Sequence, residues 1–409
     1  MTSKGSINRL KMSKFKLNAL LEITQAITAN LPVDELLKKY EKILREELNI
    51  GKILIHKYSV EWECILAAGC SPNMYKNIDV ERDLMKYSEI TFVPSGEENI
   101  LKAFDIIIPV LNNNVHLAFV LIGDIDEEGE GVSPVIKHLN FIQTISNIII
   151  VAIENIRLFN ESLRQEALKK ELELASKMQS MLIPNNHELP HNNKIFVTGF
   201  YLPHYNVGGD YYDCILLNED EIGFCIADVS GKGISAALLM SNFQANLRAL
   251  FTHEISLVSL VEKLNKRVIH SAAGEKFITL FIARYNYNTK ILQYINAAHN
   301  PPVLYNTVSG NIFLFQTSCV GVGMLDKIPE IKEGSFEIKE RSKILCYTDG
   351  LSELPDENGQ EIGIRAIEQN LSNQDRIDKN IKTLIEKENI VSGNTKLFDD
   401  VSIIGIEFY

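Results

Sequence analysis

Aspartates at the ends of apolar runs are the residues of this sequence whose types and spacing suggest shared chemistry. A carboxylate at the end of a buried strand is unfavourable unless it is paired with a cation or hydrogen-bonded. No histidine or cysteine is directly adjacent to these aspartates in the chain, so the donors favour hard cations such as Mg²⁺ or Mn²⁺ over Zn²⁺. The candidates are Asp210 in "VGGDYYD", Asp228 in "CIADVSGKG", Asp349 in "CYTDGLSE", and Asp399 with Asp400 in "FDDVSIIG".

The elements that must position these acids are short strands. Beyond Pro190 the sequence has many apolar or alternating runs, which predict a β-rich region. Helical patterns interrupt it at Ser235 to His253, at Ser256 to Ala273 and at about 365–387. A sheet core with helices packed outside is the architecture that this pattern favours.

The amino-terminal third has a different pattern. Two helices are predicted between Lys14 and Leu48, because apolar residues recur there at helical spacing. Four apolar strands follow and predict an α+β domain with an antiparallel sheet. The polar stretch from Ser71 to Asn99 is either a segment that closes over a ligand or a plain surface loop. The strands are "KILIHKYS", "WECILAAG", "FDIIIPVL" and "HLAFVLIGD".

A long helix is predicted between the two regions, from His138 to Ile183. Its apolar residues step by threes and fours, which is the spacing of a coiled-coil seam. A register slip follows Leu163, and Pro184 ends the pattern. The helix is predicted to be a dimeric signalling stalk, the alternative being an ordinary packed linker. The first register comprises Ile142, Ile145, Ile149, Ala152, Ile156, Phe159 and Leu163, and the second Leu168, Leu172, Ala175, Met178 and Leu182.

Composition narrows the class of protein. The 409 residues include 41 Lys and Arg against 53 Asp and Glu, and the net charge of −12 argues against nucleic acid as the main partner. The opening residues show no signal-peptide pattern, and the most apolar run, Ile145 to Ile153, is shorter than the roughly 20 residues that span a bilayer. Six cysteines without a C-x-x-C pair predict reduced thiols. A cytoplasmic protein with no membrane segment is expected.

Residues from about Glu171 to Tyr409 resemble the SpoIIE/RsbU branch of the PP2C-type serine/threonine phosphatases, on the four aspartate motifs and the stretches "ELELASKMQSMLIP", "FITLFIARYN" and "INAAHNPPVLY". The resemblance implies an α-β-β-α sandwich with an acidic cleft that binds two Mn²⁺ or Mg²⁺ ions. It implies that Asp210 and Asp228 bridge the metals and that Asp349 and the acidic pair hold the second one. Asp399 is the ligand in the family's pattern, and Asp400 is a neighbour that could exchange roles with it. The carbonyl of Val229 matches the family's backbone ligand.

Two metals suit the hydrolysis of a phosphomonoester, because they lower the pKa of a water and neutralise phosphoryl charge. No protein nucleophile is then needed, and the sequence has no Cys-x5-Arg loop. The chain departs from the wider family in having Ser230 where eukaryotic members place a histidine, and Ala298 where glycine is usual. Glu353 is either a third, weaker metal ligand or a helix-cap carboxylate. The loop with Asn296, His299 and Asn300 is predicted to be structural.

Residues 14–155 resemble a GAF domain, by pattern and position and without a diagnostic motif. The expected organisation is a GAF-like α/β/α sensor domain over 14–155, a helical coiled-coil linker over 156–190 and a phosphatase domain over 191–409. The resemblance implies a homodimer in which a small molecule or protein at the GAF domain controls dephosphorylation. The resemblance of the carboxy-terminal region to the SpoIIE/RsbU phosphatases further implies that the substrate is a phosphorylated STAS-domain anti-sigma-factor antagonist in a partner-switching pathway.

Three other functions were weighed against this hypothesis. A nucleotide P-loop is rejected, because Ile226 and Gly233 stand where that motif needs glycine and Ser or Thr. A GAF-linked diguanylate cyclase would need Glu-Phe after "GGD", whereas Tyr211 and Tyr212 follow. A catalytically silent pseudophosphatase that only binds a phosphoprotein is the remaining alternative, and the complete set of matched aspartates argues against it.

Overall fold

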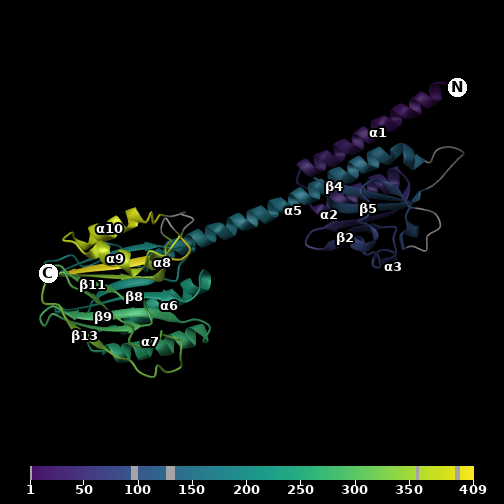
Figure 1. Cartoon of the computed structure of the whole chain (residues 1–409). Helices are drawn as coiled ribbons and strands as arrows, with labels where there is room; N and C mark the ends of the chain where they lie inside the picture. Colours follow the sequence, from purple (N-terminus) through teal and green to yellow (C-terminus); the bar gives the residue numbers. More distant parts are fainter. Residues whose placement is uncertain (1, 94–99, 126–133, 356–358, 392–396) are drawn as a thin grey trace. The chain divides into compact units, whose positions relative to one another are not determined.

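The computed structural model describes residues 2–93, 100–125, 134–355, 359–391 and 397–409. The chain divides into two compact units, Met1–Glu166 and Ala167–Tyr409 (Figure 1). Each unit has its own sheets and its own hydrophobic core, and each is described by itself below.

The amino-terminal unit is built on one antiparallel five-stranded sheet in the order β2-β1-β5-β4-β3. Both helices predicted before the sheet and the four predicted strands are present, and segment 94–99 of the polar stretch lies outside the described residues. The strands are β1 Ile50–Tyr58, β2 Trp62–Ala68, β3 Thr91–Phe92, β4 Ile106–Asn112 and β5 Val115–Ile125. The helices are α1 Thr2–Thr28, α2 Val33–Lys42, α3 Pro72–Tyr75, α4 Val80–Asp83 and α5 Pro134–Ser180, with a π-helical turn at Ile43–Glu47 and a 3₁₀ turn at Ile100–Ala103.

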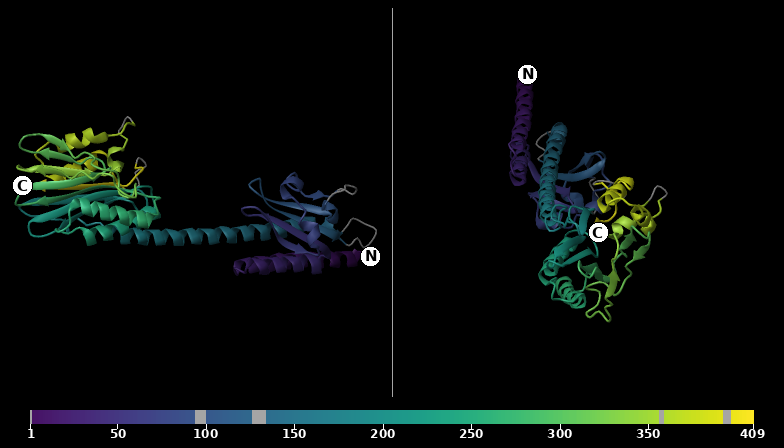
Figure 2. Two further views of the ribbon diagram at one scale, coloured as in Figure 1. Left: turned by 90° about the horizontal axis from the view of Figure 1, so that it is seen from below. Right: turned by 90° about the vertical axis from the view of Figure 1, so that its left-hand side faces the viewer.

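Apolar residues cover both faces of this sheet. On one face α1, α2 and α5 enclose a cluster that includes Leu36, Ile53 and Ile122 (Figure 2). On the other face a smaller cluster contains Leu54 and Phe104. Because successive side chains of a strand point to opposite faces, β1 reads as an apolar run instead of an alternating one.

Helix α5 extends over 47 residues and matches the predicted helix to within a few residues. The first part of the proposed seam packs inside the amino-terminal unit, where Ile142, Ile145 and Ile149 are fully buried. A helix that packs on a sheet needs almost the same apolar spacing as a coiled coil, so the sequence pattern did not separate the two cases. By length and composition the helix would suit a membrane over His138–Ser180, but 44% of its most apolar stretch is buried in the structure.

The carboxy-terminal unit consists of two five-stranded antiparallel sheets, β13-β10-β9-β8-β7 and β12-β11-β14-β15-β6. The first contains β7 Tyr211–Leu216, β8 Glu221–Val229, β9 Ile278–Asn286, β10 Ile291–Ala297 and β13 Gly334–Glu337. The second contains β6 Ile195–Leu202, β11 Val303–Asn306, β12 Ile312–Leu314, β14 Ser342–Tyr347 and β15 Val401–Phe408. The helices are α6 Ile234–Leu250, α7 Leu257–Ala272, α8 Asp349–Ser352, α9 Gly363–Leu371 and α10 Ile377–Lys387.

The two sheets stack face to face, with α6 and α7 outside the first and α9 and α10 outside the second (Figures 1 and 2). The main core lies between the sheets and beneath α6 and α7, and a second cluster lies beneath α9 and α10. The predicted α-β-β-α sandwich is confirmed. The single helix expected over 365–387 is instead two helices, α9 and α10, separated by the polar turn 372–376.

The buried position of Ile149 predicts a stability effect. Ile149→Ala should lower the free energy of unfolding of the amino-terminal unit by about 3 kcal/mol, because it leaves a cavity in that core. Val60→Ala, at a turn position that is 89% exposed, should change it by less than about 0.5 kcal/mol. Denaturation followed by the fluorescence of Trp62, the chain's single tryptophan, reports on this unit. Equal effects of the two substitutions would contradict the core assignment.

Candidate metal centre

All five predicted acids lie at one end of the sandwich. Asp210 directly precedes β7, and Asp228 is the next-to-last residue of β8. These strands are antiparallel neighbours, with Tyr211 opposite Ala227, so the start of one meets the end of the other. Likewise β14 ends just before Asp349, and β15 begins just after the pair Asp399 and Asp400. Two adjacent strand pairs, one from each sheet, therefore bring the carboxylates together.

Asp210 is the most deeply buried of these acids, with 2% of its surface exposed. Burial raises its pKa, and the nearby carboxylates of Asp228 and Asp400 raise the pKa further. One oxygen accepts a hydrogen bond of 2.7 Å from the hydroxyl of Thr348, the residue before α8. Sequence reasoning missed Thr348, although a hydroxyl residue between a strand and "DG" was a visible signal.

Asp228 faces the acids of the second sheet. Burial raises its pKa to about 7, with further contributions from the charges of Asp349 and Asp399. Burial and the charge of Asp399 also raise the pKa of Asp349. Like charges this close oppose one another's ionisation. A cation bound among these carboxylates would therefore favour their ionised forms.

The adjacent acids Asp399 and Asp400 have different surroundings. Asp400 is buried, and its two oxygens accept backbone hydrogen bonds from His204 at 2.8 Å and from Gly209 at 2.6 Å. Asp399 has a side chain that is 32% exposed and forms an ion pair of 2.8 Å with Lys232. Asp400 therefore holds the loop before Asp210, whereas Asp399 is partly exposed and is paired with Lys232.

The glycines before Asp210 allow close approach of the chain. A Cβ at Gly208 would overlap a carboxylate oxygen of Asp400 and the hydroxyl of Tyr201. A Cβ at Gly209 would lie 3.0 Å from the carbonyl oxygen of Val229. The Val229 carbonyl thus lies beside the loop that carries Asp210, as a backbone ligand at this position would require.

Lys232 is a second residue of the site that sequence reasoning missed. Its motif was compared only with a nucleotide P-loop. Its ammonium group binds Asp399 and donates to the carbonyl of Phe398. Lys232 is the partner of the partly exposed Asp399, and its charge also lowers the pKa of Asp349. It supplies the positive charge that partly compensates the carboxylates here.

The donor set fits a hard divalent cation. Every candidate ligand is an oxygen, and the raised pKa values show carboxylates that a bound cation would favour in their ionised form. Within the described ranges no three His, Cys, Asp or Glu side chains are grouped as a ready cation site. Thr348, Lys232 and backbone amides bind several of the carboxylate oxygens.

Polar contacts around the acids agree with a structural role for the loop after β10. Burial lowers the pKa of His299 to about 4, and its Nδ1 lies 2.8 Å from the hydroxyl of Thr279, the cross-strand neighbour of Asp228. The side chain of Asn296 accepts a hydrogen bond from the His299 backbone amide. Ala298 has a φ of 53°, which explains why glycine suits this position.

Two other residues singled out from the sequence lie at the edge of the site. The hydroxyl of Ser230 accepts a 2.9 Å hydrogen bond from the backbone of Phe277, so it is already engaged in joining two strand ends. Glu353 is exposed, and partial burial together with the charge of Asp349 raises its pKa. Its role as a third metal ligand stays a prediction.

Comparison with known proteins assigns the carboxy-terminal part of the chain. Residues 218–409 match the family model of stage II sporulation protein E (SpoIIE). Phosphoserine phosphatase RsbU of Bacillus subtilis (strain 168) is 27% identical over 195 residues, which are 48% of this chain and 57% of that protein. Phosphoserine phosphatase RsbP of the same organism is 28% identical over 188 residues, 45% of each chain. The chain thus spans about half the length of the curated relatives it matches.

The solved structure of the SiaA-PP2C domain of Pseudomonas aeruginosa superimposes with a TM-score of 0.51 at 16% identity, covering 61% of this chain and 99% of that one. This similarity shows a PP2C-like fold. Residues 218–409 thus match the SpoIIE domain and are similar in sequence to RsbU and RsbP, and the carboxy-terminal unit has a PP2C-like fold.

The raised pKa of Asp228 predicts how stability depends on pH without metal. A folded-state pKa of about 7, above the ordinary aspartate value of 3.8, means that stability present at low pH is lost as pH rises through that range. Asp228→Asn should weaken this dependence and stabilise the metal-free protein at pH 8. Calorimetry of the full chain in EDTA measures both. Exposed Asp220 provides the control Asp220→Asn, and an identical pH dependence in all three proteins would contradict the prediction.

Proposed function

We propose that this protein is a metal-dependent serine/threonine phosphoprotein phosphatase of the PP2C type. Its two ions would be Mn²⁺ or Mg²⁺. The observation that carries the proposal is the meeting of carboxylates from four chain segments at one end of a PP2C-like sandwich. The ligands that we assign are the side chains of Asp210, Asp228, Asp349 and Asp399 and the carbonyl of Val229.

Each residue has a distinct task in this mechanism. The two ions would supply a water of lowered pKa and neutralise charge on the phosphoryl group. Asp210 and Asp228, whose carboxyl groups lie close together beside β7 and at the end of β8, would help to hold the ions. Asp349 and Asp399 would hold the second ion, and the Lys232 ammonium would compete with that ion for Asp399. Asp400 keeps the loop of Asp210 in place through the amides of His204 and Gly209.

The substrate class follows from the relatives. RsbU and RsbP are both named phosphoserine phosphatases, so a phosphoserine or phosphothreonine on a protein is the substrate expected here. We propose a STAS-domain anti-sigma-factor antagonist as that protein, within a partner-switching pathway in the cytoplasm. The absence of a cysteine nucleophile from the described acid cluster agrees with direct attack by water.

We further propose that the amino-terminal region regulates this activity. Residues 14–155 would form a GAF-like sensor domain that binds a small molecule or protein, residues 156–190 a helical linker, and residues 191–409 the phosphatase. The α-helical cover and five-stranded antiparallel sheet of the first unit support this division.

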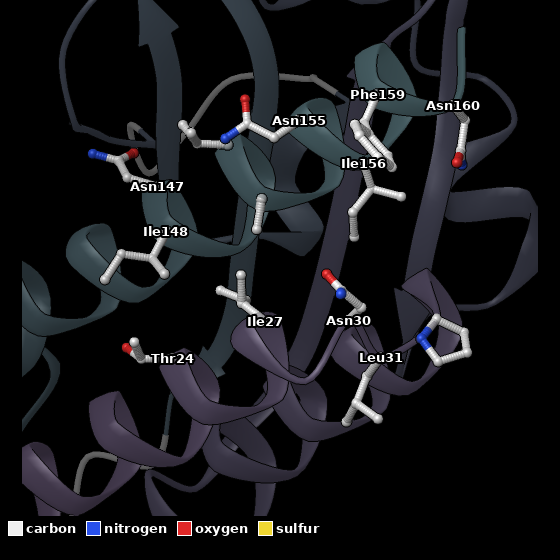
Figure 3. A pocket seen from close by; sticks show the side chains of 13 residues that line it. Thr24, Ile27, Asn30, Leu31, Asn147, Ile148, Asn155, Ile156, Phe159 and Asn160 are labelled. Atoms are coloured by element: carbon white, nitrogen blue, oxygen red, sulfur yellow. The ribbon is translucent and has the colours of Figure 1, made fainter. Parts of the chain in front are cut away.

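A homodimer is the assembly that we propose. A groove of about 1080 Å³ lies between the end of α1, the following turn and α5 within the amino-terminal unit (Figure 3). No charged residue lines it, although the chain carries a net charge of −12. The groove includes the exposed side chain of Phe159, and the exposed apolar side chains of Leu158 and Leu163 lie beside it on α5. The same helix of a second copy would cover this stripe, and asparagines such as Asn155 could pair across the two-fold axis.

Hydrolysis by the Asp228→Asn variant tests the phosphatase. The wild-type protein should cleave a generic phosphomonoester with Mn²⁺ and not with EDTA, and the variant should lose at least about a hundredfold in turnover because it lacks one bridging charge. Asp220→Asn is the control for an exposed aspartate. Near-normal turnover by a folded Asp228→Asn protein would refute the assignment. A wild-type protein that binds Mn²⁺ without turnover would favour the pseudophosphatase.

The dimer is tested by charge placed in the groove. Phe159→Asp together with Ile148→Asp should reduce the mass measured by light scattering to that of one chain, because a carboxylate would have to be buried between the copies. Val60→Asp, at an exposed turn of the same unit, should leave the mass unchanged. An unchanged mass in the groove variant, or a wild-type protein with the mass of one chain, would argue against this interface.

A further inference from the structure

The last turn of α5 contacts the backbone of the loop that carries Asp210. Gln179 is 7% exposed, and its side chain makes two hydrogen bonds with one residue, Gly208. Its Nε2 donates to the Gly208 carbonyl at 2.6 Å, and its Oε1 accepts from the Gly208 amide at 3.0 Å. An amide side chain that satisfies both backbone groups of one residue fixes that residue's position and orientation.

The contact is two residues from a proposed metal ligand. Gly208 and Gly209 lead directly into Asp210, and the Gly209 amide donates to Asp400 at 2.6 Å. Asp400 and Tyr201 pack so closely on Gly208 that even a methyl group would overlap them. Gln179 therefore holds the loop from one side and Asp400 holds it from the other.

The end of α5 is itself fixed to the phosphatase unit. The Pro184 carbonyl, just beyond the helix, accepts a 3.3 Å hydrogen bond from the hydroxyl of Tyr212 on β7. Ile183 is buried in the main core, whereas Met178 and Met181 are exposed. In this turn Gln179 is the polar side chain that reaches the loop, so any rotation or axial shift of the helix end must break its bonds or move Gly208.

We propose that Gln179 is a positioning residue that couples the end of α5 to the metal-binding loop, so that displacement of this helix end changes the placement of Asp210. The inference rests on the proposed metal centre and adds to it a route of regulation. The helix that ends here begins at Pro134, within the amino-terminal unit. Coupling is reciprocal, so cation binding at Asp210 must also stabilise the last turn of α5.

The test measures Mn²⁺ affinity on the full-length protein. Gln179→Met keeps the size of the side chain and removes both hydrogen bonds, and it should weaken Mn²⁺ binding by at least fivefold in calorimetric titration. Gln179→Glu keeps the acceptor for the Gly208 amide and should show a smaller loss. Gln165→Met makes the same exchange at an exposed position of α5 and should bind as the wild type does. Wild-type affinity in the folded Gln179→Met protein would overturn the proposal.

Hydrogen exchange provides a second readout that a merely structural role would not move. In the wild-type protein Mn²⁺ should slow exchange of the amides of residues 176–182, and in Gln179→Glu this protection should be reduced. If Gln179→Met fails to fold, the comparison of the wild-type protein with Gln179→Glu tests the proposal instead. Equal protection of residues 176–182 in these two proteins would overturn the coupling. Mn²⁺-dependent protection without phosphoester hydrolysis would refute the proposed phosphatase and retain the coupling. Hydrolysis with no effect of Gln179 on Mn²⁺ binding would refute the coupling alone.

Discussion

Repulsion among buried carboxylates is the constraint on which the rest of the carboxy-terminal unit depends. Burial and neighbouring negative charge raise the pKa values of Asp210, Asp228 and Asp349 together. Such a group is destabilising without a cation, so its neighbours must hold it by directed bonds. Thr348 donates to Asp210, backbone amides donate to Asp400, and Lys232 pairs with Asp399. The negative charge of these oxygen ligands exceeds the single positive charge of Lys232, so the group favours a bound cation.

The scaffold meets this constraint through antiparallel pairing. In an antiparallel pair the end of one strand lies beside the start of the other. The pairs β7–β8 and β14–β15 therefore place all five acids at one end of the sandwich. Helix α6 is bound to β7. Its Arg248 makes two hydrogen bonds, of 2.7 and 3.0 Å, with the fully buried Asp213 of that strand. Tyr211 also donates to Asp213. The strand that begins after Asp210 is thus fixed by charge pairing as well as by its ladder.

Much of this arrangement could be predicted from the sequence. Apolar runs that end in aspartate identified all five acids, and short strands interrupted by helices predicted the sandwich. The seam of α5 was less informative, because Ile142 and Ile149 satisfy the spacing of a coiled coil while packing on their own sheet. Thr348, Lys232 and Gln179 were not assigned, since their roles depend on which distant groups the fold brings to them. A polar residue in a helical pattern, such as Gln179, looks the same whether it faces solvent or a loop.

Asp399 and Asp400 are adjacent in the sequence but make different contacts in the structure, which the sequence alone does not predict. Neighbouring side chains at the start of a strand point in opposite directions, so an acidic pair rarely acts as a unit. Here one member is buried and has both oxygens bound by backbone amides, while the other is partly exposed. Asp400 is tied to Gly209, and Gly208 to Gln179, so the buried acid connects the metal loop to the end of α5. We therefore expect a shift of the backbone of this short loop to affect both the proposed metal ligand Asp210 and the contact with the end of α5.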